Sequence, residues 1–178
     1  MHPHLEQVFS RLDHSRAQLR AAVDAVAAPA RATKPAPDRW SVAEVIEHLS
    51  IVERLFGDRI VKAIESRGAS LESETVESTG LPDPIEARMA DRVNKRMAPE
   101  VAHPKGALAC DDCWAIVESG HHRLRSALAS ADGKALSQIS LDHPFFGSLT
   151  IYQWIELIAA HEARHTEQIK EIAVALAV

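Results

Sequence analysis

Apolar residues recur every three or four positions along four long segments of this sequence, and that spacing constrains the fold more than any other feature. Residues three or four apart lie on the same face of an α-helix, so each segment is predicted to form an amphipathic helix. The segments run from the N-terminus to about Ala28, from Ser41 to about Ser66, from about Asp111 to Ser130, and from Thr150 to the end of the chain. Four helices that each bury one face predict an all-α four-helix bundle.

The composition agrees with this prediction. Only 4% of the residues are aromatic while 46% are hydrophobic, a balance that favours helices over strands. A length of 178 residues suits one domain that spans the whole chain, 1–178. Two helix starts are also visible, because Ser41 with Glu44 and Thr150 with Gln153 each have the spacing of a capping box.

Residues 67–110 lack this periodicity and are rich in Ser, Glu, Pro and Gly, so most of the segment is predicted to be surface loop. One short extra helix is expected within it, with Asp83 as its cap and Pro84 at its first position. Its apolar face would consist of Ile85, Met89, Val93 and Met97.

The segment LSQISLDHPFFGSLT, residues 136–150, alternates briefly like a strand. It is short and isolated, so the sequence is read here as a loop that returns the chain to the last helix.

The net charge of -5 and a pI near 6.0 argue against a nucleic-acid partner, because phosphate binding needs clustered basic residues. No apolar run reaches the ~18 residues of a membrane helix, and the first residues do not resemble a secretion signal. We therefore expect a cytoplasmic protein with a small-molecule substrate. The broad apolar helix faces also favour a homodimer.

Cys110 and Cys113 form a single C-x-x-C pair, which could be a redox pair or half of a zinc site. No second pair follows, and the two aspartates between the cysteines would raise the thiol pKa values. An incidental pair at a helix start is the alternative, and the sequence leaves both interpretations open.

His161 and His165 stand four apart in HEARH, so both imidazoles can reach one metal ion from one face of a helix. The spacing matches the H-E-x-x-H signature of zinc proteases. Those enzymes need a third ligand further along the chain, whereas only thirteen residues follow His165, without histidine or glycine. The third ligand is therefore expected upstream, and Glu162, rotated roughly 100° from His161, is expected to face a neighbouring helix or water.

His48 is the best upstream candidate, because it lies three residues after Val45 and four before Val52 on an apolar helix face. Three histidines that point into one bundle are costly to bury without a partner. The sequence therefore predicts a divalent-metal site of His48, His161 and His165, with zinc or nickel as the expected ion.

Three motifs now identify a family resemblance. W-S-x-x-E-x-x-x-H-L at 40–49, H-P-x-x-G at 143–147 and H-E-x-R-H-x-x-Q-I at 161–169 resemble the DinB-like (YfiT-like) superfamily of metal-binding four-helix bundles. The resemblance implies a metal site on the same three histidines.

Other residues are candidates for roles near the metal. Glu44 and Gln168 could orient a ligand ring, although surface ion pairing is equally open for Glu44. Arg164 could hold an anionic substrate group or pair with an acid. His121 could be a fourth ligand, a base or a core residue. His143 could fold over the metal or belong to a turn.

Three imidazoles leave coordination positions open for water or substrate. The resemblance first implies a thiol-dependent S-transferase or isomerase that uses glutathione, bacillithiol or mycothiol as a cosubstrate. Hydrolysis by metal-bound hydroxide is the second interpretation. A non-catalytic, stress-related bundle stabilised by its metal is the third.

Overall fold

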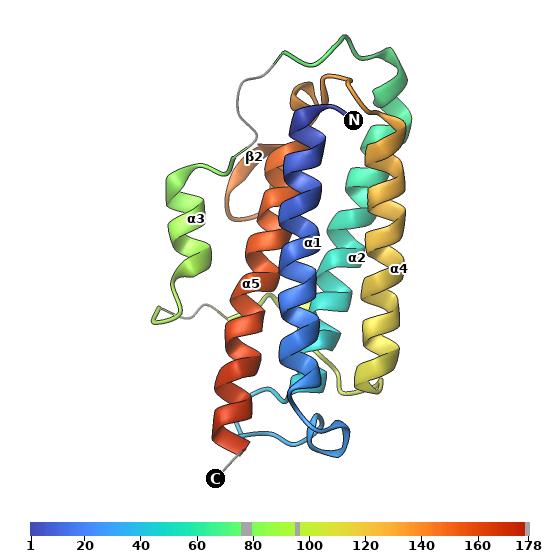
Figure 1. Ribbon diagram of the computed structural model, residues 1–178. Coiled ribbons are helices and arrows are strands. Elements are labelled where there is room, and N and C mark those ends of the chain that lie inside the picture. Colours follow the sequence, from blue (N-terminus) through green and yellow to red (C-terminus); the bar gives the residue numbers. More distant parts are fainter. Residues whose placement is uncertain (76–79, 95–96, 177–178) are drawn as a thin grey trace.

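The computed structural model describes residues 1–75, 80–94 and 97–176, and it is a four-helix bundle, which confirms the predicted all-α fold (Figure 1). A short helix, α3, lies outside the bundle against α5. The helices are α1 (Pro3–Asp24), α2 (Val42–Arg67), α3 (Asp83–Ala90), α4 (Cys110–Ser130) and α5 (Ile151–Leu176). No helix in these described ranges is long and apolar enough to cross a membrane.

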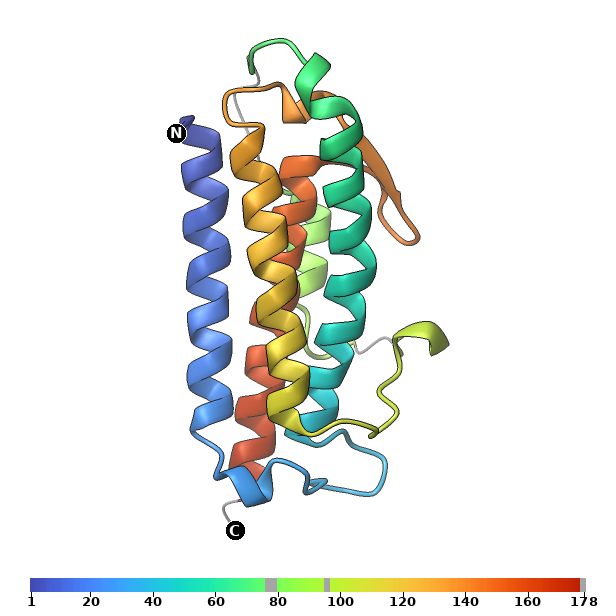
Figure 2. The ribbon, with the colours of Figure 1, turned by 90° about the vertical axis from the view of Figure 1, so that its right-hand side faces the viewer.

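The four long helices pack as two pairs of neighbours, α1 with α5 and α2 with α4. The members of each pair run in the same direction, opposite to the other pair (Figures 1 and 2). Because α2 ends and α4 begins at opposite ends of the bundle, the chain between them must return along its full length. Residues 68–109 make that connection, which explains the long segment without periodicity.

Two of the predicted helix caps form. The side chain of Ser41 accepts a hydrogen bond from the Glu44 amide at 3.2 Å, and the Glu44 carboxylate accepts one from the Ser41 amide at 2.8 Å. Thr150 and Gln153 make the equivalent pair at 3.0 and 3.3 Å. The cap predicted at Asp83 is wrong, since Asp83 is the first residue of α3 and no side chain caps that helix.

The predicted extent of α3 is also wrong. Val93 and Met97 are not on its apolar face, and they are 88% and 84% exposed. The reason is Asp91, whose Oδ1 accepts hydrogen bonds from the amides of Val93 and Asn94, both at 2.9 Å. This local turn satisfies amides that a longer helix would have used, so the helix stops at Ala90.

The loop predicted before the last helix is instead a β-hairpin of β1 (Ser140–His143) and β2 (Gly147–Thr150). Gly147 has φ of 73°, which only glycine adopts readily, and the turn depends on it. Leu149 of the hairpin is buried in the core cluster at the end of the bundle. The helices thus stabilise a pair of strands that would not be stable alone, and for this reason the prediction of a loop was wrong.

A polar layer divides the core into two apolar halves. One half packs around Leu12, Ile60 and Leu128, and the other around Leu19 and Leu49. Along each long helix, polar residues that are buried or partly buried separate the positions that belong to one half from those that belong to the other. They are Ser15, Arg16, Glu53, His121, Glu162 and His165. The functional candidates are therefore concentrated at mid-height of the bundle.

Candidate metal centre

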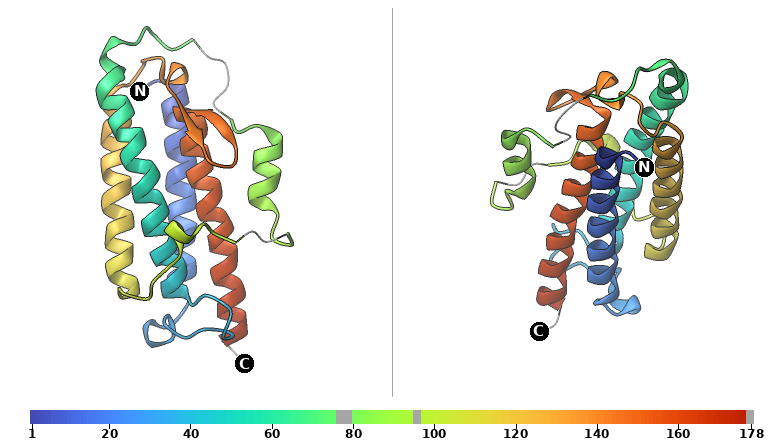
Figure 3. Two further views of the ribbon diagram at one scale, coloured as in Figure 1. Left: turned by 180° about the vertical axis from the view of Figure 1, so that it is seen from behind. Right: turned by 45° about the horizontal axis from the view of Figure 1, so that its top comes forward.

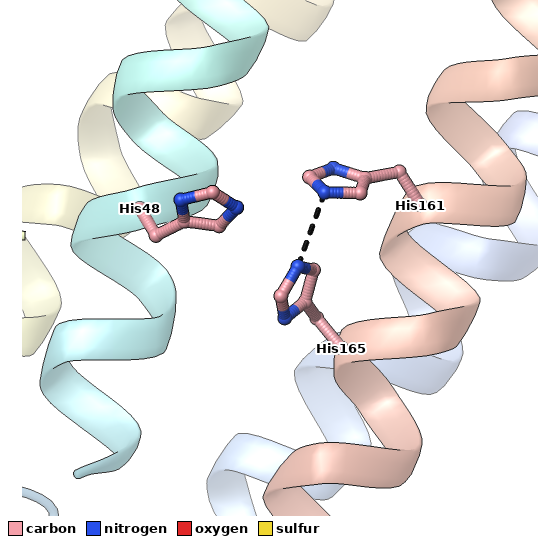
Figure 4. Close-up of side chains that lie close together, drawn as sticks. All are labelled: His48, His161 and His165. Atoms are coloured by element: carbon pink, nitrogen blue, oxygen red, sulfur yellow. Dashed lines mark hydrogen bonds between the residues drawn. The ribbon is translucent and has the colours of Figure 1, made fainter. Parts of the chain in front are cut away.

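The three predicted ligands meet between α2 and α5. His48 projects from α2, and His161 and His165 project from α5 towards it (Figure 4). One ring nitrogen from each residue lies within 4.8 Å of the other two. The Nε2 atoms of His161 and His165 are 3.1 Å apart. The arrangement brings together side chains that are 113 positions apart in sequence, from His48 to His161.

Hydrogen bonds hold two of these rings by their Nδ1 atoms. His48 Nδ1 donates to the Ala102 carbonyl at 2.7 Å, and His165 Nδ1 donates to Gln168 Oε1 at 2.9 Å. Because each neutral ring carries one proton, Nε2 of both is left with a free lone pair. Gln168 thus lies where the sequence analysis expected it, in the position from which an outer partner orients a metal ligand.

Burial keeps the three imidazoles neutral. It lowers the pKa of His48 and, together with the nearby His48 and Arg164 charges, lowers the pKa of His161 to about 3. The pKa of His165 lies well below its ordinary value for the same reason. A histidine must be neutral to bind a metal ion, so the site is in its binding-competent state at neutral pH.

The spacing of the nitrogens fits a metal ion. Two nitrogens bound to one zinc ion at about 2.1 Å lie roughly 3.4 Å apart in a tetrahedral site, close to the 3.1 Å between His161 and His165. At this distance one Nε2 atom donates a hydrogen bond to the other, and a metal ion bound by both rings would take the place of that proton. The donor set of His48, His161 and His165 therefore suits a divalent cation.

The histidines line a cavity of about 1070 Å³. One wall is aromatic and comes from Phe56 on α2, Phe146 in the hairpin turn and Trp154 on α5. In the view from behind, the hairpin lies beside the upper part of α5 and α3 lies further out (Figure 3, left). The three histidines are thus open to a space large enough for a substrate.

His143 combines both roles considered for it. Its Nδ1 accepts a hydrogen bond from the Phe145 amide at 3.1 Å, which stabilises the hairpin turn. Its ring also stacks on Phe146, with centroids 4.7 Å apart, and lines the cavity. It is outside the group of possible metal ligands found in the described part of the chain.

Two predicted neighbours of the metal are elsewhere. The Glu44 carboxylate accepts a hydrogen bond from the Ser41 amide and pairs with the Lys34 ammonium group, 2.9 Å away. Of the two roles considered for Glu44, the structure therefore shows the ion pair, and the prediction that it orients His48 is wrong. His121 lies 3.5 Å from Asp13 on another side of the bundle, which rules out a fourth ligand at this centre.

Arg164 lines the cavity, and no acidic side chain among the described residues forms an ion pair with it. Its Nη1 atom donates to the carbonyls of Met89 and Asp91, where α3 ends. A cation at this position satisfies carbonyls that have no partner within the helix. Arg164 therefore attaches α3 to α5 beside the metal centre.

Glu162 faces α1, as the sequence analysis expected, and is completely buried. Its carboxylate contacts the Arg16 guanidinium and accepts a hydrogen bond from Ser15 at 2.5 Å. It is thus on a different face of α5 from the two histidines, and the H-E-x-x-H spacing here does not place a general base beside the metal.

Cys110 and Cys113 are free thiols, and both are buried. Burial raises the pKa of both and brings that of Cys113 to about 11. Redox exchange and zinc binding both require the thiolate, which is disfavoured here. The incidental pair is the interpretation that the structure favours.

One contact could not be found from the sequence. The carbonyl that orients His48 belongs to Ala102, in the segment predicted to be surface loop. Every residue has a backbone carbonyl, so no residue type at position 102 signals this role.

Comparison with known proteins supports the family resemblance. Residues 11–169 match the DinB superfamily. The protein YuaE of Bacillus subtilis (strain 168) is 31% identical over 140 residues, which are 78% of this chain and 80% of YuaE.

Two solved structures have a similar fold. TT2238, a four-helix bundle protein, superposes with a TM-score of 0.57 at 18% identity, over 94% of this chain and 98% of its own. YfiT from Bacillus subtilis, described as a probable metal-dependent hydrolase with an unusual four-helix bundle topology, superposes with a TM-score of 0.57 at 16% identity, over 97% and 87%. At these identities the two structures establish the fold alone.

Proposed function

Because the chain belongs to the DinB superfamily, we propose that it is a metal-dependent enzyme that acts on a small molecule. His48, His161 and His165 would hold a divalent metal ion, zinc or nickel. Its homodimeric state and its cytoplasmic location are proposals of the same kind.

The observation that carries this proposal is the opening of the three-histidine cluster into a cavity of about 1070 Å³. Structural zinc sites use four protein ligands and are closed, whereas catalytic sites use three and leave a position for water or substrate. The cavity therefore favours catalysis over the non-catalytic, stress-related bundle.

A divalent metal ion supplies one chemical effect here, a lower pKa of the thiol or water that it binds. The protein residues provide the rest. The Ala102 carbonyl and Gln168 hold the rings of His48 and His165 in place. The aromatic wall excludes water from one side of the cavity.

Thiol transfer is our first candidate reaction. Ligand cavities of about 300–1000 Å³ hold drug-sized molecules, and this cavity, with about 1070 Å³, is at the upper end of that range. It has room for a low-molecular-weight thiol, such as glutathione, bacillithiol or mycothiol, together with a small electrophile. The sulfur would form a bond to the electrophilic carbon, the bond from that carbon to its leaving group would break with departure of the leaving group as an anion, and the thiol proton would go to solvent.

Hydrolysis is the second candidate. It is favoured by the shared fold with YfiT, which is described as a probable metal-dependent hydrolase. Water would take the place of the thiol at the same three-histidine centre.

The test of metal binding is elemental analysis of untagged protein after incubation with zinc or nickel and removal of excess ion. We expect about one ion per chain in the wild type and a loss of most of it in His48→Ala and His165→Ala. His121→Ala, which removes a histidine outside the centre, should retain the ion. A wild type without metal, or variants that keep it, would refute the proposal.

A second experiment separates the two reactions. The zinc-loaded protein is incubated with each of the three thiols and 1-chloro-2,4-dinitrobenzene, and separately with 4-nitrophenyl acetate. A rate with one thiol that disappears in His48→Ala supports transfer. Ester cleavage alone, lost in the same variant, supports hydrolysis.

A further inference from the structure

Four arginines gather on one side of the cavity, around two carboxylates. The closest pair joins Arg92 Nη2 to Glu171 Oε1 at 2.8 Å. Arg39 Nη2 is 3.4 Å from the other oxygen of Glu171, and Arg88 Nη1 is 3.3 Å from Asp91 Oδ2. All four arginines line the cavity, and we call them the arginine cluster; they are Arg39, Arg88, Arg92 and Arg164.

These charges do not balance. Glu171 is shared by two guanidinium groups and Asp91 pairs with a third, so two carboxylates face four cations. Three more acidic residues line the cavity, Asp38, Glu53 and Asp142, but none of them makes an ion pair with the cluster in the part of the chain that the structure describes, and Glu53 pairs with Arg16. Among the paired groups, the cluster keeps an excess of positive charge. The chain as a whole has a net charge of -5, so this excess is a local arrangement.

Arg164 is the member with unused donors. Only its Nη1 atom is bonded, to the carbonyls of Met89 and Asp91, and its Nε and Nη2 atoms have no acceptor among the described residues. Arg88 and Arg92 are close enough to repel its charge. An anion placed between these guanidinium groups would accept hydrogen bonds from the free Arg164 donors and would reduce the repulsion between the three positive charges.

The cluster is next to the metal centre. Arg164 lies between His161 and His165 on α5, and its charge acts on both rings. The aromatic wall of Phe56, Phe146 and Trp154 borders the same cavity. A ligand that satisfies both walls has an apolar, preferably aromatic, body and one anionic group.

We propose that Arg88, Arg92 and Arg164 form a subsite for the anionic group of an amphipathic organic substrate, a carboxylate, sulfonate or phosphate whose apolar body contacts the aromatic wall. The subsite rests on the proposed function in one respect, that the cavity is where the substrate binds. It makes α3 a specificity element, because α3 contributes Arg88 and is attached by Arg164.

The experiment compares two fluorescent probes with nearly the same aromatic body. 8-Anilinonaphthalene-1-sulfonate carries an anionic group, and N-phenyl-1-naphthylamine is uncharged. Both are titrated into zinc-loaded and metal-free protein at one fixed ionic strength, because salt screens exposed charges. The proteins are the wild type, Arg88→Gln/Arg92→Gln and a control, Arg123→Gln. Arg123 is an exposed arginine of α4 that pairs with Asp58 and does not line the cavity.

We expect the double variant to bind the sulfonate about tenfold more weakly than the wild type, since one charge-assisted contact is worth about 1.4 kcal/mol. Binding of the uncharged probe should change less than twofold, and Arg123→Gln should bind both probes as the wild type does. An equal loss for both probes would show that the arginines only shape the cavity, and no change for the sulfonate would exclude the subsite.

Arg164→Lys provides a separate check, because it keeps the charge while removing the planar donors. A weaker sulfonate affinity with an unchanged thermal unfolding midpoint supports the subsite, and an unchanged affinity counts against a direct contact of Arg164. The metal-free titrations distinguish the two proposals. If the protein binds no metal but still prefers the sulfonate to the uncharged probe, the subsite is supported and the metal-dependent function is refuted. If the protein binds metal but has no such preference, the metal-dependent function is supported and the subsite is refuted.

Discussion

Two buried polar regions share helix α5, and they differ in whether a cationic side chain of the protein lies among their members. His161 faces α2 and the cavity as part of the metal centre. Glu162, the next residue, faces α1 as part of a buried charge cluster with Arg16 and Glu53. The charge cluster contains its own cation, Arg16, whereas the metal centre consists of three imidazoles that can act as metal ligands. Neighbouring residues on one helix can therefore have a structural and a binding role.

The two carboxyl groups of the charge cluster disfavour each other's ionisation. Burial and the neighbouring Glu53 raise the pKa of Glu162 above its ordinary value. Burial also raises the pKa of Glu53, against the lowering effect of Arg16. Arg16 supplies the positive charge of the cluster, although its Nε and Nη1 atoms and one oxygen of Glu53 have no hydrogen-bond partner among the described residues.

Removal of the cation should have the largest effect. Arg16→Met leaves two buried carboxyl groups without a positive partner, so we expect the free energy of unfolding to fall by about 3–5 kcal/mol, measured by urea denaturation. The matched control is Arg20→Met, one turn along α1, where the ion pair to Asp24 is exposed to solvent and its loss should lower the free energy of unfolding much less. Equal losses in the two variants would contradict the difference drawn between buried and exposed pairs.

The metal centre should respond to its outer partner without a large loss of stability. Gln168→Leu removes the acceptor that orients His165, and we expect zinc affinity to fall 10- to 100-fold in a competition titration with a chelator. Glu167→Gln, at an exposed neighbouring position, should leave the affinity unchanged. An unaltered affinity in Gln168→Leu would mean that the hydrogen bond does not contribute to metal binding.

Glu162→Gln tests whether the two regions are independent. We expect a loss of about 1–2 kcal/mol in the free energy of unfolding, because Arg16 and Ser15 lose a carboxyl oxygen as their hydrogen-bond acceptor. Zinc content should remain that of the wild type, and so should any rate found with the thiol or ester substrates. A rate that collapses in a stably folded variant would instead assign Glu162 a part in the reaction.

The smallest effect concerns a pocket histidine outside the metal centre. Burial lowers the pKa of His143 to about 4. Its unfolded value is about 6.5, so its contribution to stability is present above pH 6.5 and is lost as the pH falls towards 4. Between pH 7 and 5 the metal-free wild type should lose about 1 kcal/mol more than His143→Phe, after allowance for partial exposure. Parallel pH profiles in urea denaturation would contradict this.

Much of the site could be predicted because its signals are local. Capping residues and apolar spacing act within one or two helical turns, so the four long helices and the starts of α2 and α5 could be recognised in the sequence. The spacing of His161 and His165 predicted their common face for the same reason. His48 was found because its position in an apolar stripe implies an inward direction.

The remaining features depend on contacts between distant segments. The hairpin is held by the bundle beneath Leu149, and the length of α3 depends on a turn at Asp91 that competes with the helix. The Ala102 carbonyl and Arg92 come from the segment between the predicted second and third long helices, where the sequence has little periodicity.

The amino-acid sequence thus established an all-α bundle and three histidines that face its interior, because helix period and capping are properties of neighbouring residues. Which partners those side chains meet was settled by packing. The pairing of α5 with α1 gives Glu162 its cation, and the return of residues 68–109 along the bundle brings a carbonyl to His48 and arginines to the cavity. These contacts join residues far apart in sequence, so they exist only once the chain is folded.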